Sequence, residues 1–599
     1  MDYASCRSLP AMFFATARQR AGQPFLWAKR DKRYHPLSWG EVEAAVSRLA
    51  RALIAYGIEP GDRVALVSEN RPEWVIADLA IMSAGAITVP AYVTNTGNDH
   101  RHVLGNSGAH AVIVSTGALA ARVLPGAAQT PSIRFAITME PADTSAVKFP
   151  VHGWDEALAA GADEADTVAE RAAKLAPDDI ACIIYTSGTG GAPKGVLLTH
   201  RNIIANCYGA YKVLEYLGLG DEVFLSFLPL SHSYEHTAGM FFPISIGAEI
   251  YFAEGADTLA ANLLEARPTI MTAVPRLYET MHQRIHRQIQ RERGLKRRLF
   301  ERAVAVGRKR IAGQPLSFGE RALDPLLDRF VRAKVRARFG GRLKAMVSGG
   351  APLNPEIGGF FVALGVELLQ GYGQTEAAPV IACNQPGRIR IDSVGPPLAG
   401  VEIRIAEDGE ILVGGDNVMK GYWNDPEATA RSLADGWLHT GDIGHLDAEG
   451  YLHITDRKRD FIKNSGGDMI SPLRVEGALT LMPEIAQAMV FGDRRPYLVA
   501  VLVPDPEFAA YFAKEHEAAG DLPALAAHPG FHKALGDVVA RVNRELAPIE
   551  RVRRFLIADE PFSIDNAQMT PTLKIRRHAI REAYETAFDS LYEGKGIAA

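Results

Sequence analysis

The feature that most constrains the fold of this 599-residue chain is an alternation of short apolar runs with longer helical patterns. An apolar run at 62–70 precedes a helical pattern over 72–85 and a second apolar run over 86–93, and the stretch 110–139 repeats this order. Such alternation is typical of α/β layers with buried, largely parallel strands. We therefore predict an α/β fold with a large, layered N-terminal domain.

The pattern changes near residue 400. VEIRIAEDGEILVGG and HLDAEGYLHITD each predict two strands joined by a Gly-containing turn, which indicates a small β-rich portion within the large domain. A charged run at 456–460 follows, and beyond it an α+β pattern of ordinary domain size. We predict an N-terminal domain at 1–455, a hinge at 456–460 and a smaller, mobile α+β domain at 461–599.

Charge and cysteine content exclude several classes of protein. The chain has 65 Lys and Arg against 70 Asp and Glu, a net charge of −5, so we expect no nucleic-acid partner. Its 4 cysteines form no CxxC pair, which favours a reducing compartment. The longest apolar stretch, 79–93, is too short to span a bilayer and predicts a core helix entering a strand. We expect a cytoplasmic protein, with peripheral contact to the inner face of the membrane left open.

The segment 284–310 is strongly basic, with intermittent apolar residues. A solvated helical face would explain it, and so would attraction to an anionic membrane surface or to an acidic partner. Both interpretations remain open from the sequence.

The strongest local signal is a loop rich in glycine and hydroxyl groups, between the apolar strands IACII and GVLLT. Glycines let the backbone N–H groups approach an anion, and the hydroxyls and a lysine add donors and charge, so a nucleotide polyphosphate is the expected guest. The loop is not a Walker A motif, because Pro193 precedes Lys194 and Gly195 follows it. The residues expected to bind ATP here are Thr186, Ser187, Gly188, Thr189, Gly191 and Lys194.

A second motif, Gly371 to Glu376, follows the apolar stretch VELLQ. Tyr372 offers an aromatic face to adenine, Thr375 can bind a phosphate oxygen, and Glu376 is a hard oxygen ligand suited to Mg²⁺. Upstream, the turn Ser348 to Pro352 closes the strand LKAMV.

With its glycine-rich loop and the ordered motifs that follow, the chain resembles the adenylate-forming enzymes, which include acyl-CoA synthetases, peptide-synthetase adenylation domains and beetle luciferases. Gly190 stands where that family commonly has Thr or Ser. The segment 435–442, DGWLHTGD, matches the family's GW…TGD signature, and 456–467 resembles its hinge, with Arg459 where Lys is commoner. The ending MTPTLKIRR resembles that of long-chain acyl-CoA synthetases.

The resemblance implies a site built from both domains. Lys574 is expected to be the adenylation lysine, and Asp442 and Arg457 are expected to contact the ribose hydroxyls. Thr186 and Glu376 are expected to bind Mg²⁺. The resemblance implies catalytic roles for Lys574, Glu376, Lys194, Thr375 and His232, with His232 gating or positioning the acyl group and not acting as a base. Further ATP contacts are expected from Gly350, Ala351, Pro352, Gly371, Tyr372, Gly373, Arg459 and Lys463.

The acyl and CoA contacts follow from the same resemblance. Gly349 is expected to keep the acyl channel open, and Tyr234, Phe241 and Phe242 to line an apolar tunnel. Ser465, Gly466 and Gly467 are expected along the pantetheine passage.

The activity implied is ATP-dependent activation of a fatty acid, with long chains favoured, as acyl-AMP, followed by transfer to CoA and release of AMP and pyrophosphate. Three alternatives stay open: loading of a carrier protein's pantetheine, a synthetase for medium-chain or aryl acids, and an inactive nucleotide-binding protein. ATP, Mg²⁺ and CoA are the expected cofactors and cosubstrates.

Overall fold

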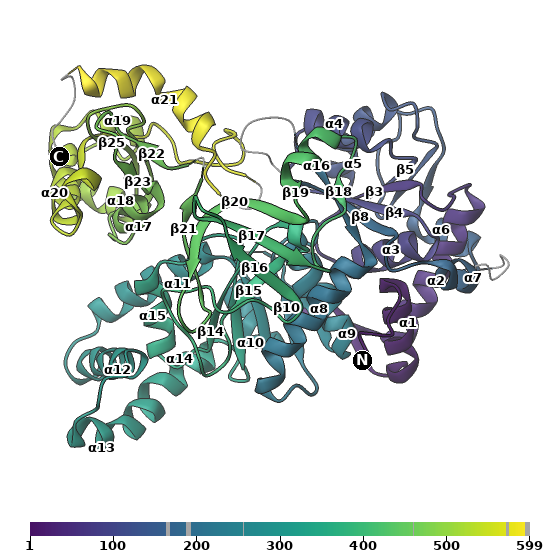
Figure 1. The fold of residues 1–599 in the computed structure, drawn as a ribbon, viewed down its shortest axis with the longest axis horizontal. Coiled ribbons are helices and arrows are strands. Elements are labelled where there is room, and N and C mark those ends of the chain that lie inside the picture. Colours follow the sequence, from purple (N-terminus) through teal and green to yellow (C-terminus); the bar gives the residue numbers. More distant parts are fainter. Residues whose placement is uncertain (163–167, 187–192, 256, 459, 571–573, 594–599) are drawn as a thin grey trace.

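The structure is a computed structural model that describes residues 1–162, 168–186, 193–255, 257–458, 460–570 and 574–593. Two lobes are visible in Figure 1, and the smaller one is formed by the C-terminal part of the chain. Among the described residues, the buried apolar clusters of the large lobe extend to Leu452, and those of the small lobe begin at Ile462. The two lobes therefore have separate cores.

The first large sheet has the strand order β18-β9-β8-β4-β3-β5-β6-β7. Its strands β3 to β7 are parallel, whereas β8 and β9 form an antiparallel pair. Helices α1 to α3 bury one face of the sheet in the main core, and α4 and α5 bury the other. The strands are β3 (Arg63–Val67), β4 (Ile87–Ala91), β5 (Ala111–Val114), β6 (Phe135–Thr138), β7 (Val151–Gly153), β8 (Ile180–Thr186), β9 (Lys194–Thr199) and β18 (Gly421–Tyr422). The helices are α1 (Leu9–Arg20), α2 (Trp39–Ala55), α3 (Pro72–Ser83), α4 (Gly97–Ser107), α5 (Gly117–Ala128), α6 (Trp154–Ala160) and α7 (Val168–Lys174).

The second large sheet has the order β15-β14-β13-β12-β10-β11-β1-β2 and parallel pairing from β14 to β1. Its strands are β1 (Pro24–Arg30), β2 (Arg33–Ser38), β10 (Val223–Ser226), β11 (Glu249–Phe252), β12 (Ile270–Ala273), β13 (Ala345–Ser348), β14 (Leu368–Gly373) and β15 (Val380–Cys383). A third core joins this sheet to the basic helices. The helices of this region are α8 (His200–Leu214), a π-helix (Glu235–Phe241), α9 (Phe242–Ile246), α10 (Leu259–Ala266), α11 (Pro275–Arg291), α12 (Leu295–Ile311), α13 (Phe318–Leu327), α14 (Ala333–Arg338) and α15 (Pro355–Ala363).

The predicted β-rich portion forms a small antiparallel sheet in which β21 extends β20. It contains β16 (Val401–Ile405), β17 (Glu410–Gly415), β19 (Leu433–Ala434), β20 (Trp437–Leu446) and β21 (Leu452–Arg457), with α16 (Pro426–Ser432) beside it. The first two residues of the predicted hinge, Asp456 and Arg457, therefore belong to a strand of this sheet.

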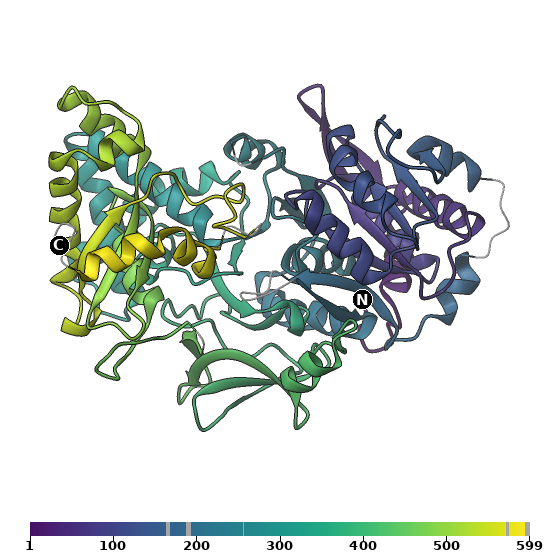
Figure 2. The same ribbon diagram turned by 90° about the horizontal axis from the view of Figure 1, so that it is seen from above.

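The small lobe combines the sheet β24-β25-β26 with a short hairpin, β22-β23, and helices on the outside (Figure 2). Its strands are β22 (Ile462–Lys463), β23 (Met469–Ile470), β24 (Ile485–Phe491), β25 (Leu498–Pro504) and β26 (Val552–Ile557). Its helices are α17 (Pro472–Thr480), α18 (Pro506–Glu515), α19 (Leu522–Ala526), α20 (Pro529–Asn543) and α21 (Arg577–Tyr592).

The predicted α/β class, with a β-rich portion and a smaller α+β lobe, is confirmed. The stretch 79–93 is the end of α3 followed by β4, as expected of a core helix entering a strand. Among the described helices, none combines the length and apolar character that a membrane crossing requires.

Candidate active site

The polyphosphate loop begins and ends at a cross-strand pair, Thr186 of β8 and Lys194 of β9. Four of its expected ligands lie outside the described residues: Ser187, Gly188, Thr189 and Gly191. The Lys194 Nζ lies 3.9 Å from an Asp425 carboxylate oxygen and 5.1 Å from the centre of the Tyr422 ring. These contacts hold the ammonium group beside the end of the loop, where a phosphate would be bound.

Glu376 lies in the short 3₁₀ turn Thr375–Ala377, which follows β14. Its Oε1 accepts a hydrogen bond of 2.8 Å from the Tyr422 hydroxyl, so Tyr422 contacts both Glu376 and Lys194. The neighbouring Thr375 hydroxyl shares a 3.0 Å hydrogen bond with Ser233. The sequence analysis did not identify Tyr422, since an aromatic residue in the polar stretch KGYWNDP also fits a surface turn.

The expected ribose contacts form a triad on three strands. Asp442 on β20 and Arg457 on β21 are cross-strand partners, with the arginine Nε 3.4 Å from a carboxylate oxygen. Tyr372 on β14 donates its hydroxyl to the other oxygen of Asp442 at 2.5 Å. Burial and the Asp442 charge raise the pKa of Tyr372. A ribose diol facing this triad would meet a fixed, ionised acceptor.

Two glycine positions show why the backbone has little choice here. A Cβ at Gly373 would lie 1.9 Å from the Pro379 carbonyl oxygen, so no other residue fits. Gly350 adopts a φ of 82° in the turn after β13, a conformation that favours glycine. Gly371, Ala351 and Pro352 lie in the same two segments, close to Tyr372 and Gly349 along the chain.

Lys574 reaches this site from the small lobe. Its N–H accepts support from the Thr570 hydroxyl at 3.1 Å, and its carbonyl accepts from the Thr570 N–H at 2.8 Å. Desolvation, followed by the charge of Arg457, lowers the pKa of Lys574 to about 8, and the charges of Asp442 and Glu376 oppose that shift. The structure thus brings Lys574 together with three expected site residues of the large lobe.

The expected acyl side of the site lies next to the same lysine. Burial, with a smaller contribution from the Lys574 charge, lowers the pKa of His232 to about 3, so its ring is neutral. The His232 Nδ1 accepts the Tyr234 N–H at 3.1 Å, and the Tyr234 hydroxyl donates to the Val347 carbonyl at 3.0 Å. A Cβ at Gly349 would lie 3.0 Å from the Tyr234 ring, so these two residues are in direct contact.

Phe241 and Phe242 lie one turn or more beyond Tyr234 and are completely buried in the main core. Phe241 packs against His236, with ring centres 5.0 Å apart, and Phe242 packs against Phe224 at 6.0 Å. A role in lining an acyl tunnel stays a prediction for both.

The hinge and pantetheine residues form a separate group on the small lobe. Arg459 lies outside the described residues. Lys463 is exposed, and its carbonyl accepts the Arg494 N–H at 2.7 Å. The Ser465 N–H donates to the Arg495 carbonyl at 2.9 Å, and Gly466 and Gly467 complete the turn. The hydrogen bonds of this group therefore go to its own lobe and not to the Asp442 triad.

The oxygen donors fit a cation that a nucleotide brings with it. Within the described ranges, no group of three or more His, Cys, Asp or Glu side chains converges as a protein-made metal cage would require. Glu376 and Thr186 offer one carboxylate and one hydroxyl. Mg²⁺ commonly binds through one or two protein oxygens together with substrate phosphates and water.

A layered lobe with a polyphosphate loop, a carboxylate that faces the ribose position and a lysine supplied by a second lobe define a nucleotide-binding enzyme. Residues 13–423 match the family described as AMP-binding enzyme, and residues 459–596 match the AMP-binding enzyme C-terminal domain. The chain belongs to the AMP-binding enzyme family, and the resemblance to adenylate-forming enzymes is confirmed.

Relatives narrow this further. The chain is 33% identical over 570 residues to the long-chain-fatty-acid–CoA ligase FadD15 of Mycobacterium bovis, covering 92% of each protein. It is 31% identical to long-chain-fatty-acid–CoA ligase 5 of Rattus norvegicus, covering 96% of this chain and 85% of the relative. The adenylation domain of the carboxylic acid reductase from Segniliparus rugosus, solved with AMP and a carboxylic acid, has the same fold, with a TM-score of 0.78, 23% identity and coverage of 98% and 94%.

Proposed function

We propose that the protein activates long-chain fatty acids as acyl-AMP and transfers the acyl group to CoA, releasing AMP and pyrophosphate. The observation that carries this proposal is the meeting of Lys574 with Glu376, Asp442 and Arg457 across the two lobes. The long-chain fatty acid–CoA ligases among its relatives, matched over most of their length, support the choice of substrate.

The first half-reaction brings together two anions, a carboxylate and the α-phosphate of ATP. Lys574 supplies a positive charge between them, and Lys194 holds the departing pyrophosphate. Asp442 and Arg457 fix the ribose, and Tyr372 faces adenine, so the α-phosphorus is held for in-line attack. Mg²⁺, bound by Glu376 and Thr186 together with the phosphates, would add further charge neutralisation when present.

The second half-reaction forms a thioester: the CoA thiol loses its proton, its sulfur attacks the acyl carbon, and AMP leaves. We propose that the small lobe rotates about residues 456–460, which removes Lys574 and brings Ser465, Gly466 and Gly467 to the thiol's path. The neutral His232 ring and the Tyr234–Gly349 contact position the acyl group in both steps.

The test is pyrophosphate release measured across carboxylic acids of increasing chain length, with and without CoA. We expect the highest kcat/KM with long-chain fatty acids and acyl-CoA as product. A maximum at acetate or benzoate would contradict the substrate, and acyl-AMP formation without thioester formation would point to a carrier protein as acceptor.

We further propose peripheral membrane contact through the helices that follow β12. Residues 275–338 carry 18 Lys and Arg against 6 Asp and Glu, although the whole chain is negative. Phe318, Leu326 and Phe330 in this region are 89%, 51% and 50% exposed. The neighbouring acids Glu320, Asp324 and Asp328 are each paired with a Lys or Arg. Exposed apolar residues among basic ones suit an anionic lipid surface.

Vesicle sedimentation tests the membrane proposal. We expect binding to vesicles that contain anionic phospholipid, weaker binding to neutral vesicles, and loss of binding in the double variant Phe318→Ser with Phe330→Ser. The matched control is Tyr511→Ser on the small lobe, where an aromatic residue is 64% exposed. Equal binding by the double variant and the control would contradict the proposal.

A further inference from the structure

The two lobes touch at a second place besides the active site, along α11. Arg276 of α11 donates to the Ala486 carbonyl on β24 at 3.1 Å, and Asn354, the N-cap of α15, donates to the Gly477 carbonyl at 3.2 Å. Leu481 of the small lobe packs against the third core of the large lobe. These contacts define an interface between α11 and the small lobe.

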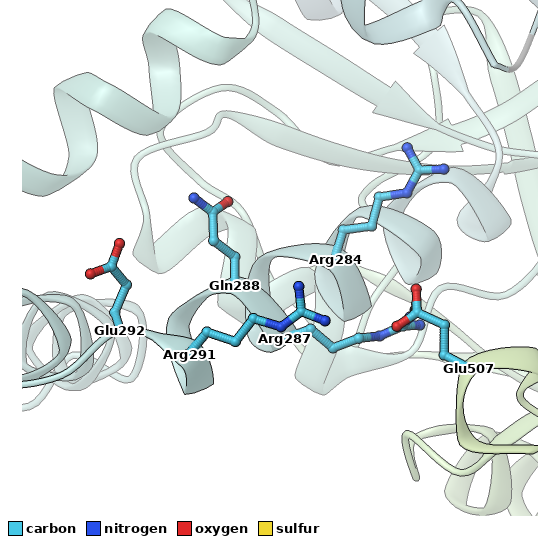
Figure 3. Close-up of a pocket in the computed structure, with 6 residues that line it drawn as sticks. All are labelled: Arg284, Arg287, Gln288, Arg291, Glu292 and Glu507. Carbon is cyan, nitrogen blue, oxygen red and sulfur yellow. Dashed lines mark ion pairs between the residues drawn. The ribbon is translucent and has the colours of Figure 1, made fainter. Parts of the chain in front are cut away.

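Arg287 provides the ion pairs of this interface (Figure 3). One of its terminal nitrogens lies 3.3 Å from an Asp505 oxygen, and the other pairs with Glu507. Asp505 is fixed in place because it caps α18, accepting the N–H groups of Glu507 and Phe508 at 3.0 and 3.1 Å. One guanidinium group of the large lobe thus grips the first turn of a small-lobe helix.

The grip is located where it can open. Arg287 lines a cavity of about 530 Å³ together with Arg284 and Arg291 on the same helix and Glu507 opposite. The Arg287 side chain is 25% exposed and that of Glu507 is 65% exposed. Exposed ion pairs are weak and screened by salt, so this contact biases an orientation and does not lock it.

A short path of contacts joins the interface to Lys574. Gln487, next to Ala486 on β24, donates to the Phe562 carbonyl at 3.0 Å and to the Met569 sulfur at 3.4 Å. It also accepts the Phe562 N–H at 2.9 Å. Met569 precedes Thr570, whose backbone and hydroxyl hold Lys574. The strand that Arg276 touches therefore also supports the segment carrying the lysine.

We infer that Arg287 is a positioning residue that holds the small lobe in the adenylate-forming orientation through Asp505 and Glu507. The inference rests on the proposed function. Lys574 meets Glu376 and Asp442 in the same arrangement of lobes in which Arg287 meets its two carboxylates. Rotation of the small lobe for thioester formation would separate Arg287 from both, so the pairs favour the first half-reaction alone.

The test compares both half-reactions in Arg287→Ala. We expect acyl-adenylate formation, measured as single-turnover pyrophosphate release, to fall about three- to tenfold, as loss of interactions of this weak class permits. Thioester formation from supplied acyl-adenylate should stay unchanged or rise. The matched control is Arg284→Ala, which removes an arginine from the same cavity whose ion pairs, within the described residues, do not include a carboxylate of the small lobe.

A double-mutant cycle adds a readout that a merely structural role would not move. Asp505→Asn with Glu507→Gln removes both carboxylates and keeps the helix cap, because Asn caps as well as Asp. Adding Arg287→Ala to that variant should cause no further loss, and Arg287→Lys in the otherwise unchanged protein should recover part of the rate.

Equal losses in both half-reactions, strict additivity in the cycle, or an unchanged ratio of the two rates would each overturn the inference. Failure of the proposed function is distinguishable, since the unmodified protein would then form no acyl-adenylate from any fatty acid.

Discussion

At the scale of single residues, the site is organised by one mobile charge. Lys574 lies near two carboxylates and one arginine, and burial lowers its pKa to about 8 although Asp442 and Glu376 oppose that shift. Desolvation makes the charge less stable and also more effective, since attraction to an anion is stronger where water is scarce. The lysine is therefore suited to bind two anions and to leave once they have reacted.

Lys574→Ala should remove this charge from the first step alone. We expect the rate of acyl-adenylate formation to fall about 100-fold or more, the size typical of losing a group that stabilises developing charge. Thioester formation from supplied acyl-adenylate should be spared, because the lysine has left the site by then. Comparable losses in the two half-reactions, measured by pyrophosphate release and by acyl-CoA formation, would refute the assignment.

The pH dependence should follow the same residue. Below the lowered pKa of about 8, Lys574 is protonated and its charge is fully present. As pH rises through that value the charge is lost, so the adenylate-forming rate should decline above pH 8 while the thioester step shows no such decline. A lysine with an ordinary pKa would shift the decline above pH 10. Rate profiles of the two half-reactions between pH 6 and 10 decide between them.

At the scale of elements, the sequence predicted what is local. Apolar runs and turns led to β3, β4, β16 and β17, because each strand's own residues show its burial and its ends. Contacts across long separations were not predictable: Tyr422 and Glu376 lie 46 residues apart, and Arg287 and Asp505 lie 218 apart. Polar side chains of this kind look like ordinary surface residues until the fold brings them together.

The segment between β13 and α15 makes a testable element of the acyl site. In Gly349→Val, the first added carbon would already lie 3.0 Å from the Tyr234 ring, and the two methyl groups have still less room. Overpacking of this kind costs about 1–3 kcal/mol. If Tyr234 and Gly349 border the acyl channel, kcat/KM for a long-chain acid should drop more than for a short-chain acid, with ATP binding unchanged.

The control for that prediction is Gly359→Val on α15, where an added Cβ meets no atom within 4 Å. It should leave the chain-length profile unchanged, apart from a modest change in helix stability. A uniform loss across all acids in Gly349→Val would place the residue outside the acyl channel.

At the scale of the whole molecule, two lobes with separate cores share one site. The small lobe must hold Lys574 rigidly while it turns as a unit. A buried ion pair contributes to that rigidity: Arg577, three residues after the lysine and at the start of α21, donates to Glu476 of α17 through both terminal nitrogens, at 2.7 and 2.5 Å. Glu476 also accepts the Val490 N–H at 2.8 Å, so it joins α17, β24 and α21.

Glu476→Gln should therefore destabilise the small lobe and leave the large lobe nearly unchanged. The substitution leaves the guanidinium group of Arg577 partly buried without its partner, and breaking such a pair costs about 3–5 kcal/mol. Calorimetry of the full chain should show the small-lobe transition moving to lower temperature, with the large-lobe transition in place. Asp589→Asn, which breaks a pair with Arg495 whose side chains are 52% and 39% exposed, serves as the control and should cost less than about 1 kcal/mol. A single transition shifting as a whole in Glu476→Gln would show that the lobes unfold together, and the separate cores would then not behave as separate units.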